Sequence, residues 1–481
     1  MVGVRTPRVH RKLHVLRRTG GGYRTMTWSQ RPLATRRVRG PVPEIRPFRA
    51  LRYDPATVPD LGLVVAPPYD VIGPDEHERL LARDPANVVR LDLPSEEPGD
   101  APDDRYRRTA RTLAAWRSDG TFHKDPHASL YVYEQTYAVP GTDVVRTQRG
   151  FFARLRLEAF GPGSGVLPHE RTLAAAREDR YKLLRATGVN TSPVIVLYDD
   201  ARSVGRSILD AATDDAPTAD LTDDDGVRHR LWVIAADGDA AARLAPLIAV
   251  AGEHPVVIAD GHHRYETALR YRDERRMARA CEEDPAFDYL LALFVDAAGE
   301  QLTVLPTHRI LRGLGEAGVG RLMGGLDDLF DVRRDIGRDE LIARFEAAAL
   351  AAGGAGAFGL WTRDGGVLLT ARRDAFEPFL PAGGDAVRAL DVTLLGVALE
   401  QLAGLDAEAV AAGAIAFTKS AMDAVERVDS GLDGADAAFL LEPTPIASVV
   451  AVATDGDVMP QKSTYFYPKA LTGLVINPHE W

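Results

Sequence analysis

Residues 254–269 read His-Pro-Val-Val-Ile-Ala-Asp-Gly-His-His-Arg-Tyr-Glu-Thr-Ala-Leu and join a strand signal to a helix signal. The β-branched run 256–258 is short, apolar and bounded by proline and glycine, which predicts a buried strand. Glu266 and Arg270 then lie four apart in the order that stabilises a helix. The residues between these two signals, 260–264, therefore occupy a turn from a strand into a helix.

Five residues fill this turn: Asp260, Gly261, His262, His263 and Arg264. A helix start leaves free backbone N–H groups and a positive dipole end, which favour an anion such as phosphate. Gly261 lets the anion approach the backbone, Arg264 offers a planar fork of donors, and the two histidines add polar groups. Asp260 is placed to hold a metal ion or take a proton, and His262 is a further catalytic candidate. A solvated Asp-Gly turn is the alternative interpretation.

This stretch resembles the signature of a bacterial and archaeal family, domain of unknown function 1015. Two more segments match that family: Ala-Pro-Pro-Tyr-Asp at 66–70 and Met-Pro-x-Lys-Ser-Thr-x-Phe-x-Pro-Lys at 459–469. The resemblance covers nearly the whole chain from Ile45 onward. The turn is also similar to the phosphate-binding turn of the ParB/sulfiredoxin superfamily. Members of that superfamily include nucleotide-hydrolysing partition clamps, sulfiredoxins and free-serine kinases.

The resemblance adds candidates that lie far from the turn in the sequence. It makes Tyr69 and Asp70 candidates for substrate binding, whereas the residues alone predict an ordinary turn there. Glu170, preceded by His169 and followed by an amphipathic helix, is a second carboxylate for catalysis. The family carries a similar His-Glu pair at this point, which favours a role in the site.

The C-terminal segment 456–474 supplies cations and hydroxyls. Only six of the 58 basic residues are lysine, and two of these six fall within eight residues here. Lys462 is a compact cationic partner for phosphate, and Ser463 and Thr464 add donors beside it. A tail that docks through its aromatic residues is the alternative interpretation of this segment.

The predicted fold class is α/β to α+β with a mixed sheet, because hairpins interrupt the alternation of strands and helices. We expect a ParB/sulfiredoxin-like nucleotide-binding core from about 45–95 and 250–300. Arg228 and Arg230 face one side of their strand, where they could clamp phosphate or carboxylate or line a solvated edge. The predicted strands are 63–66, 87–93, 129–139, 144–157, 193–198, 227–234, 256–258, 289–295 and 301–305, with hairpins joining 129–139 to 144–157 and 289–295 to 301–305.

A chain of 481 residues is long enough for two or three domains. We expect a basic disordered extension at 1–43, or coding sequence upstream of a start at Met26. A main α/β domain at 44–312 carries the turn. An auxiliary α+β region follows at 313–481, and its tail, 456–474, returns to the site.

Composition restricts the class of protein. The only cysteine, Cys281, allows no intramolecular disulfide and no cysteine-based zinc cluster, which suits a reducing cytoplasm. No run approaches the roughly 20 apolar residues that span a bilayer. Residues 1–43 hold eleven basic and no acidic residues, so the remainder of a chain of net charge −11 carries −22. An acidic body argues against wrapping nucleic acid, although the basic arm could touch it.

The leading hypothesis is a nucleotide-dependent phosphotransferase, because phosphoryl transfer mainly requires positioning and charge neutralisation. Resemblance implies ATP or ADP with Mg²⁺, the metal held by Asp260, and free L-serine as first candidate among small hydroxylated metabolites. A ParB-like nucleotide-binding switch without metabolite turnover is the second hypothesis. A metal-dependent hydrolase using Asp260, His262, His263 and Glu170 is the third, because adjacent histidines rarely bind one ion. The sequence leaves the oligomeric state open.

A chain that starts at Pro41 should fold and bind its ligand like the full chain. The basic arm has a charge run without apolar periodicity, a composition that cannot build a core. Thermal unfolding and ligand titration of both chains check this, and a large loss of melting temperature or affinity on truncation would contradict it.

Overall fold

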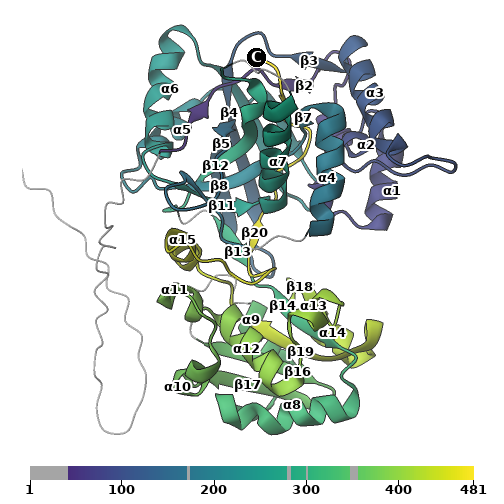
Figure 1. The fold of residues 1–481 in the computed structure, drawn as a ribbon, viewed down its shortest axis with the longest axis vertical. Helices are drawn as coiled ribbons and strands as arrows, with labels where there is room; N and C mark the ends of the chain where they lie inside the picture. Colours follow the sequence, from purple (N-terminus) through teal and green to yellow (C-terminus); the bar gives the residue numbers. More distant parts are fainter. Residues whose placement is uncertain (1–41, 171–173, 279–282, 300–301, 347–355) are drawn as a thin grey trace, which may run out of the picture. The chain divides into compact units, whose positions relative to one another are not determined.

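The described chain is built around two large β-sheets (Figure 1). The computed structural model describes residues 42–481 except 171–173, 279–282, 300–301 and 347–355. The predicted basic extension, 1–43, thus lies almost entirely outside the described residues. Helices pack on both sheets, and the larger sheet mixes parallel with antiparallel strands, which confirms the predicted mixed α/β fold class. Among the described residues, no helix has the length and apolar character to span a bilayer.

The larger sheet has nine strands in the order β6-β11-β8-β12-β5-β4-β10-β9, with β1 paired to β5. Strand β12 runs parallel to β8 and antiparallel to β5, so the sheet changes direction near its centre. The hairpin predicted over 129–157 is confirmed as β4 and β5. The strands are β1 (Ile45–Arg46), β4 (Ser129–Ala138), β5 (Val145–Arg156), β6 (Val166–Leu167), β8 (Val194–Tyr198), β9 (Ala219–Thr222), β10 (Arg228–Ala235), β11 (Val256–Asp260) and β12 (Tyr289–Asp296).

Four helices share a core with one face of this sheet: α4 (Ala174–Thr187), α5 (Val204–Ala212), α6 (Gly238–Ala251) and α7 (His262–Ala278). Helix α7 is mostly charged, but Tyr265, Ala268 and Tyr271 recur every three residues and are buried. This spacing places the three side chains on one helical face. Their burial against the sheet fixes α7, and with it the turn where the helix begins.

Alternation along β11 divides its side chains between two cores. Val256 and Ile258 pack in the cluster that includes the four helices, whereas Val257 and Ala259 pack in the cluster on the other face. Strand side chains point to opposite faces with a period of two, so a run of apolar residues suits a strand buried on both sides. Asp260 is the last residue of this strand and therefore lies at the edge of both apolar clusters.

The second sheet is wholly antiparallel, in the order β15-β17-β16-β19-β14-β18. Its strands are β14 (His308–Arg312), β15 (Phe330–Ile336), β16 (Ala357–Thr362), β17 (Gly365–Ala371), β18 (Ile415–Thr418) and β19 (Ala435–Leu441). One face packs with α9 (Arg338–Glu346) and α14 (Ala421–Ser430). The other packs with α8 (Gly315–Leu329), α12 (Asp391–Ala403) and α15 (Ile446–Thr454).

Shorter elements complete the chain. Three strand pairs join β2 (Leu51–Tyr53) to β3 (Phe122–Lys124), β7 (Val189–Asn190) to β21 (Asn477–Pro478), and β13 (Thr303–Leu305) to β20 (Tyr465–Tyr467). The remaining α-helices are α1 (Pro74–Arg83), α2 (Val89–Asp92), α3 (Asp104–Ser118), α10 (Arg373–Phe376), α11 (Asp385–Arg388) and α13 (Ala407–Ala411). Short 3-10 helices are η1 (Leu61–Leu63), η2 (Tyr69–Val71), η3 (Ala286–Asp288), η5 (Glu377–Phe379) and η6 (Leu432–Gly434).

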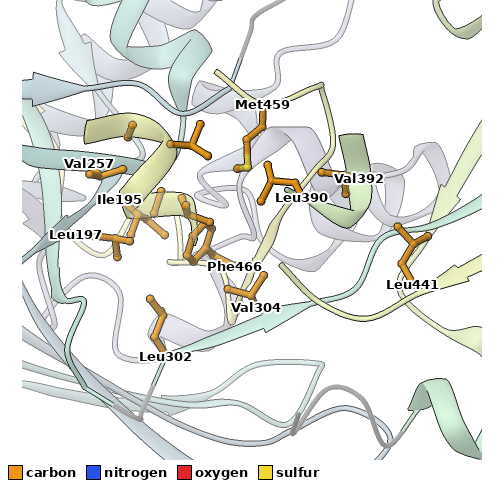
Figure 2. Close-up of a cluster of buried hydrophobic side chains, with 14 of the residues drawn as sticks. Ile195, Leu197, Val257, Leu302, Val304, Leu390, Val392, Leu441, Met459 and Phe466 are labelled. Carbon is orange, nitrogen blue, oxygen red and sulfur yellow. The ribbon is translucent and has the colours of Figure 1, made fainter. Parts of the chain in front are cut away.

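One apolar cluster contains side chains from both sheets and from the C-terminal segment. Figure 2 shows Phe466 of β20 beside Val304 of β13, in the same cluster as Val257 of β11. Leu390 and Leu441, from the region of the second sheet, belong to it as well. The C-terminal segment is therefore held by the core rather than attached at its surface.

Three local predictions are wrong. The segment 63–66 is not a strand, because Asp60 accepts a hydrogen bond from the Gly62 N–H and starts the short helix η1. The segment 87–93 is helical from Val89, whose N–H donates to the side chain of Asn87 at 3.0 Å. Strand β13 pairs with β20 rather than with β12, because β8 and β5 already occupy both edges of β12.

The predicted source of the core also needs correction. Of the stretch 45–95, only β1 joins the nine-stranded sheet among the described residues. The centre of the sheet comes from β4, β5 and β8, within 129–198, together with β12 from the predicted 250–300 stretch. Long β-branched and aromatic strands bury more apolar area than the short, proline-rich elements of the N-terminal stretch, which favours them at the centre.

Gly150, in the middle of β5, should not tolerate a side chain. A Cβ atom there would lie 2.4 Å from the backbone oxygen of Phe294 on β12. We expect Gly150→Ala to lower the free energy of unfolding by about 1–3 kcal/mol, the usual range for overpacking. Gly320→Ala, at an exposed position of α8 where a Cβ would have open space, should instead raise it by about 0.5–1 kcal/mol through helix propensity. Denaturant unfolding measures both, and a wild-type midpoint for Gly150→Ala would contradict this packing.

Candidate functional site

The turn after β11 has the backbone that the sequence predicts. Gly261 adopts φ +91° and α7 begins at His262, with the Tyr265 N–H donating to the Gly261 oxygen at 3.0 Å. The dihedral angle therefore favours glycine, and a Cβ at Gly261 would in addition lie 2.9 Å from Nε of Arg264 and displace its side chain. Helical hydrogen bonding starts with Tyr265, which leaves the preceding N–H groups of the first turn without a helical acceptor.

Asp260 lies between two cations. Its Oδ2 accepts from Nη2 of Arg264 at 2.5 Å, and its Oδ1 accepts from Nζ of Lys469. The three side chains are only 14%, 12% and 12% exposed. Burial by itself would raise the pKa of Asp260, but Lys469 and Arg264 outweigh burial and hold this pKa well below its ordinary value. Asp260 is therefore an anion that accepts hydrogen bonds, and a weak acceptor of a proton.

Arg264 uses both ends of its guanidinium on protein acceptors. One nitrogen donates to Asp260 and the other donates to the backbone oxygen of Pro193, which precedes β8. The fork predicted to bind phosphate thus braces Asp260 against the neighbouring strand. Its permanent charge still contributes to the potential at the turn, since guanidinium stays protonated.

His169 and His262 are buried, neutral and in contact, with ring centroids 4.6 Å apart. Nδ1 of His169 lies 2.5 Å from the oxygen of Ile258, which only accepts, so this nitrogen carries the proton. Burial lowers the pKa of His169 to about 4 and holds that of His262 well below its ordinary value. Nε2 of His262 accepts from the His169 N–H at 3.2 Å. The pair therefore fastens the segment before Glu170 to β11.

Glu170 is the second carboxylate near the turn. Burial raises its pKa to about 7, and the Lys462 N–H, the Lys462 ammonium and Lys469 oppose part of this rise. The negative charge of Asp260 acts in the same direction as burial. Glu170 also forms an isolated bridge with Met459, where the C-terminal segment arrives. A carboxyl group with a pKa near neutrality can gain and lose a proton under working conditions.

The predicted residues of the C-terminal segment lie next to this carboxylate. Lys462 has φ +56° and its backbone oxygen accepts from the Thr307 hydroxyl at 2.8 Å. Ser463 is buried and its hydroxyl donates to the Pro460 oxygen at 2.5 Å, inside its own turn. Thr464 lies 3.1 Å from Nε2 of His169. The segment thus contacts the His169–Glu170 pair directly, with Ser463 used to shape the turn.

Two residues near the turn lie outside the predicted set of site residues: Lys469, which pairs with Asp260, and His169, which contacts His262. Lys469 is the last residue of the C-terminal motif, and its ammonium also lies 4.4 Å from the centroid of the Tyr465 ring. The signal for it was the scarcity of lysine in a chain that uses arginine almost everywhere else. The signal for His169 was its place directly before Glu170.

Tyr69 lines a cavity of about 50 Å³ beside the turn, together with Arg264 and Arg180. The Arg180 guanidinium lies 4.1 Å from the centroid of the Tyr69 ring, and burial raises the pKa of Tyr69 to about 12. Two buried oxygens on residues that line this cavity, Oδ2 of Asp92 and Oγ1 of Thr267, have no hydrogen-bond partner in the described chain. Asp70 belongs to the same short helix η2 as Tyr69 and lies within electrostatic range of Arg264.

Arg228 and Arg230 are engaged elsewhere on the sheet. Arg228 pairs with Asp220 of β9, with 2.9 Å from its Nε to Oδ1. Arg230 pairs with Glu134 of β4, with 2.8 Å from its Nε to Oε1. Each guanidinium thus meets a carboxylate of a neighbouring strand, the arrangement expected of a charged sheet surface rather than of an open clamp.

The described residues do not form a metal cage. No group of three or more histidine, cysteine, aspartate or glutamate side chains among them could hold an ion. Both oxygens of Asp260, the predicted metal ligand, contact cationic nitrogens. Magnesium prefers free oxygen ligands in octahedral geometry, so the side chains at Asp260 do not fit a protein-held magnesium.

The chain belongs to the family described as "Protein of unknown function (DUF1015)", which it matches over residues 45–393. The predicted family membership is thereby confirmed. A comparison with curated proteins gave no match. Family membership establishes that the chain is related to these proteins, and its chemistry depends on the side chains described above.

Several solved structures are similar to this chain at low identity. A free serine kinase in complex with AMP is 15% identical, with 63% of this chain and 83% of that chain covered and a TM-score of 0.32. A conserved hypothetical protein from Pyrococcus furiosus is 14% identical, with 63% and 87% covered and a TM-score of 0.30. SbnI with a C-terminal truncation, from Staphylococcus aureus, is 11% identical, with 65% and 83% covered and a TM-score of 0.32. Likeness at this level carries no conclusion about the ligand of this chain.

Replacing Lys469 should destabilise the fold through Asp260. Lys469→Met leaves a buried carboxylate with Arg264 alone, so we expect a loss of about 2–3 kcal/mol, below the usual cost of a wholly unpaired charge. Because the pKa of Asp260 is lowered in the folded state, this stabilisation is present above its ordinary pKa of 3.8 and is lost as the pH falls below it. The difference between the variant and the wild type should therefore shrink in acid.

Lys182→Met is the matched control, because Lys182 pairs with Asp103 at an exposed position. Denaturant unfolding at neutral pH and at pH 3 measures all three proteins. Equal destabilisation by the two lysine variants would show that the buried pair has no special weight.

Proposed function

We propose that this protein is a nucleotide-dependent phosphotransferase that acts on a small hydroxylated metabolite, with free L-serine as the first candidate and ATP or ADP as donor. The observation that carries the proposal is the pair of carboxylates at the turn. Asp260 is held as an anion by Lys469 and Arg264, whereas burial raises the pKa of Glu170 to about 7. Surroundings that shift the pKa values of two carboxyl groups in opposite directions are typical of sites in which one group acts as acid or base and the other stabilises charge.

We assign the phosphate groups to the start of α7 and to the lysines. The first turn of the helix offers backbone N–H groups, and Gly261 adds no side chain of its own over them. Lys462 and Lys469 supply positive charge beside Glu170. In this proposal the turn acts as the ParB/sulfiredoxin turn that it resembles, with ammonium groups as the neutralising charges. Magnesium, where it takes part, belongs to the phosphates of the nucleotide rather than to Asp260.

Glu170 is assigned as the general base. The hydroxyl of the acceptor gives its proton to the Glu170 carboxylate while its oxygen bonds to the terminal phosphorus. The bond from that phosphorus to the bridging oxygen breaks, and the nucleotide leaves with one phosphate fewer. Asp260 positions Lys469 through their ion pair, and Arg264 positions Asp260. The cavity beside Tyr69 and Asp92 is assigned to the acceptor, because its unpartnered oxygens suit a small polar molecule.

A nucleotide-binding switch without metabolite turnover is the second candidate, since the same turn would bind nucleotide in either case. Binding measurements with ATP, ADP, CTP and GTP, followed by product analysis with L-serine, separate the two. Formation of a phosphorylated acceptor supports the phosphotransferase. Nucleotide hydrolysis or binding without such a product supports the switch. Hydrolysis by a protein-held metal is not proposed further, because Asp260 already contacts two cations.

Glu170→Gln should lower turnover by about 100-fold or more and leave nucleotide affinity within a few-fold. In the wild type the rate should rise with pH up to about 7, because the base must be deprotonated and its pKa is raised. The variant should lose this dependence. Glu178→Gln is the matched control, since Glu178 is exposed on α4 and pairs with Arg270. Steady-state rates from pH 5 to 9 check the prediction, and full activity of Glu170→Gln would remove Glu170 from the chemistry.

A further inference from the structure

Two of the six lysines of this chain lie over one tyrosine ring, and a third is near them. Lysine accounts for six of 58 basic residues; Lys419 and Lys469 lie over the Tyr465 ring, and Lys462, three residues before Tyr465, lies within electrostatic range of Lys419. Lys419 comes from the region of the second sheet, where it follows β18 and precedes α14. Nothing in the sequence pattern connects it with the turn at Asp260.

The Tyr465 ring holds two of the three ammonium groups. Nζ of Lys419 lies 3.9 Å from the ring centroid and Nζ of Lys469 lies 4.4 Å from it. Phe466, the next residue of β20, is buried in the core that Figure 2 shows, and alternation along the strand turns Tyr465 the other way. An aromatic face attracts a cation without cancelling its charge, unlike a carboxylate.

The charges of this cluster are incompletely neutralised. Elsewhere in the described chain, Lys124 pairs with Glu480 and Lys182 pairs with Asp103. In the cluster Lys469 pairs with Asp260, whereas Lys419 and Lys462 are exposed and have no carboxylate within 4.0 Å among the described residues.

Partial burial lowers the pKa of Lys419. The like charges of Lys469 and Lys462 lower it further, and Asp225 opposes them. The cluster thus carries excess positive charge that an anion would relieve.

The backbone around Lys419 is fixed before any ligand arrives. Ser420 caps α14, because its hydroxyl accepts from the Asp423 N–H at 3.1 Å. The same hydroxyl donates to Oε1 of Glu346 at 3.1 Å. Lys419 therefore projects from a short connection that is anchored at both ends, by β18 and by the capped helix. A pre-positioned cation loses less freedom on binding than one on a free loop.

We propose that Lys419, Lys462 and Lys469 form one binding site for a chain of two or three phosphates, and that Lys419 makes this site discriminate a nucleoside di- or triphosphate from a monophosphate. The proposal rests on the proposed function for the nucleotide, whereas the tri-lysine site itself would bind any linked phosphates. Lys419 and Lys462 bring two charges that no carboxylate of the described chain within 4.0 Å offsets, and the ammonium of Lys469 lies beside them, so several linked phosphates have more cations to meet than one phosphate has. A monophosphate placed at the start of α7 does not require the cation at Lys419.

Titration calorimetry of Lys419→Gln with AMP, ADP, ATP and inorganic pyrophosphate tests this. We expect a loss of affinity of about tenfold or more for ADP, ATP and pyrophosphate, the weight of one charged hydrogen bond, and a change of less than threefold for AMP. Lys182→Gln, which removes a carboxylate-paired lysine, should change none of the four. Tyr465→Phe should keep the discrimination and Tyr465→Leu should weaken it, because only the ring is required. Thermal unfolding shows whether each variant is folded.

Each outcome of this titration either supports or overturns the proposed tri-lysine site. Wild-type affinity of Lys419→Gln for ADP, ATP and pyrophosphate would overturn the proposal, and so would an equal loss for AMP. If the wild type binds pyrophosphate in a manner that depends on Lys419 but binds no nucleotide, the tri-lysine site stands and the proposed function fails. If it binds none of the four ligands, both fail. If Lys419→Gln is unfolded, Lys419→Ala and the two Tyr465 variants carry the test.

Discussion

The site depends on one buried carboxylate. Asp260 ends a strand that is dry on both faces, and an anion there is stable only when cations meet it. Arg264 reaches it from the first turn of α7, but Lys469 must come from 209 residues further along the chain. The ion pair therefore forces the C-terminal segment across the turn, and the segment brings Lys462, Thr464 and Tyr465 with it.

Further contacts hold the C-terminal segment in place at several points along its length. Phe466 packs in the core, and the backbone of Ile476 exchanges hydrogen bonds with that of Leu51 at 2.9 and 3.1 Å. Arg154, fully buried, donates from Nε to the side chain of Asn477 at 2.8 Å. Contacts between such distant parts of the chain cost loop entropy before they stabilise anything, so the site is completed only when the end of the chain has docked.

Two carboxylates in one site acquire opposite characters from their surroundings. Asp260 meets Lys469 and Arg264 directly and stays charged, whereas Glu170 is partly buried with weaker compensation, and the charge of Asp260 favours its neutral form. The same segment carries the lysine that holds Asp260 and the N–H that meets Glu170. Positioning, charge and acid–base behaviour are thus consequences of a single docking event, with Lys419 added from the region of the second sheet.

The sequence by itself determined what depends on neighbours along the chain. It predicted the strand, turn and helix over 256–270, with a glycine that the dihedral angle requires, the β4–β5 hairpin and the family. Tertiary structure decided which groups meet. It directed Arg264 to Asp260 and Pro193, paired β13 with β20, and selected Lys469 and His169 as neighbours of the turn. Periodicity and turn chemistry act over a few residues, whereas the partner of a buried charge is chosen by packing among segments hundreds of residues apart.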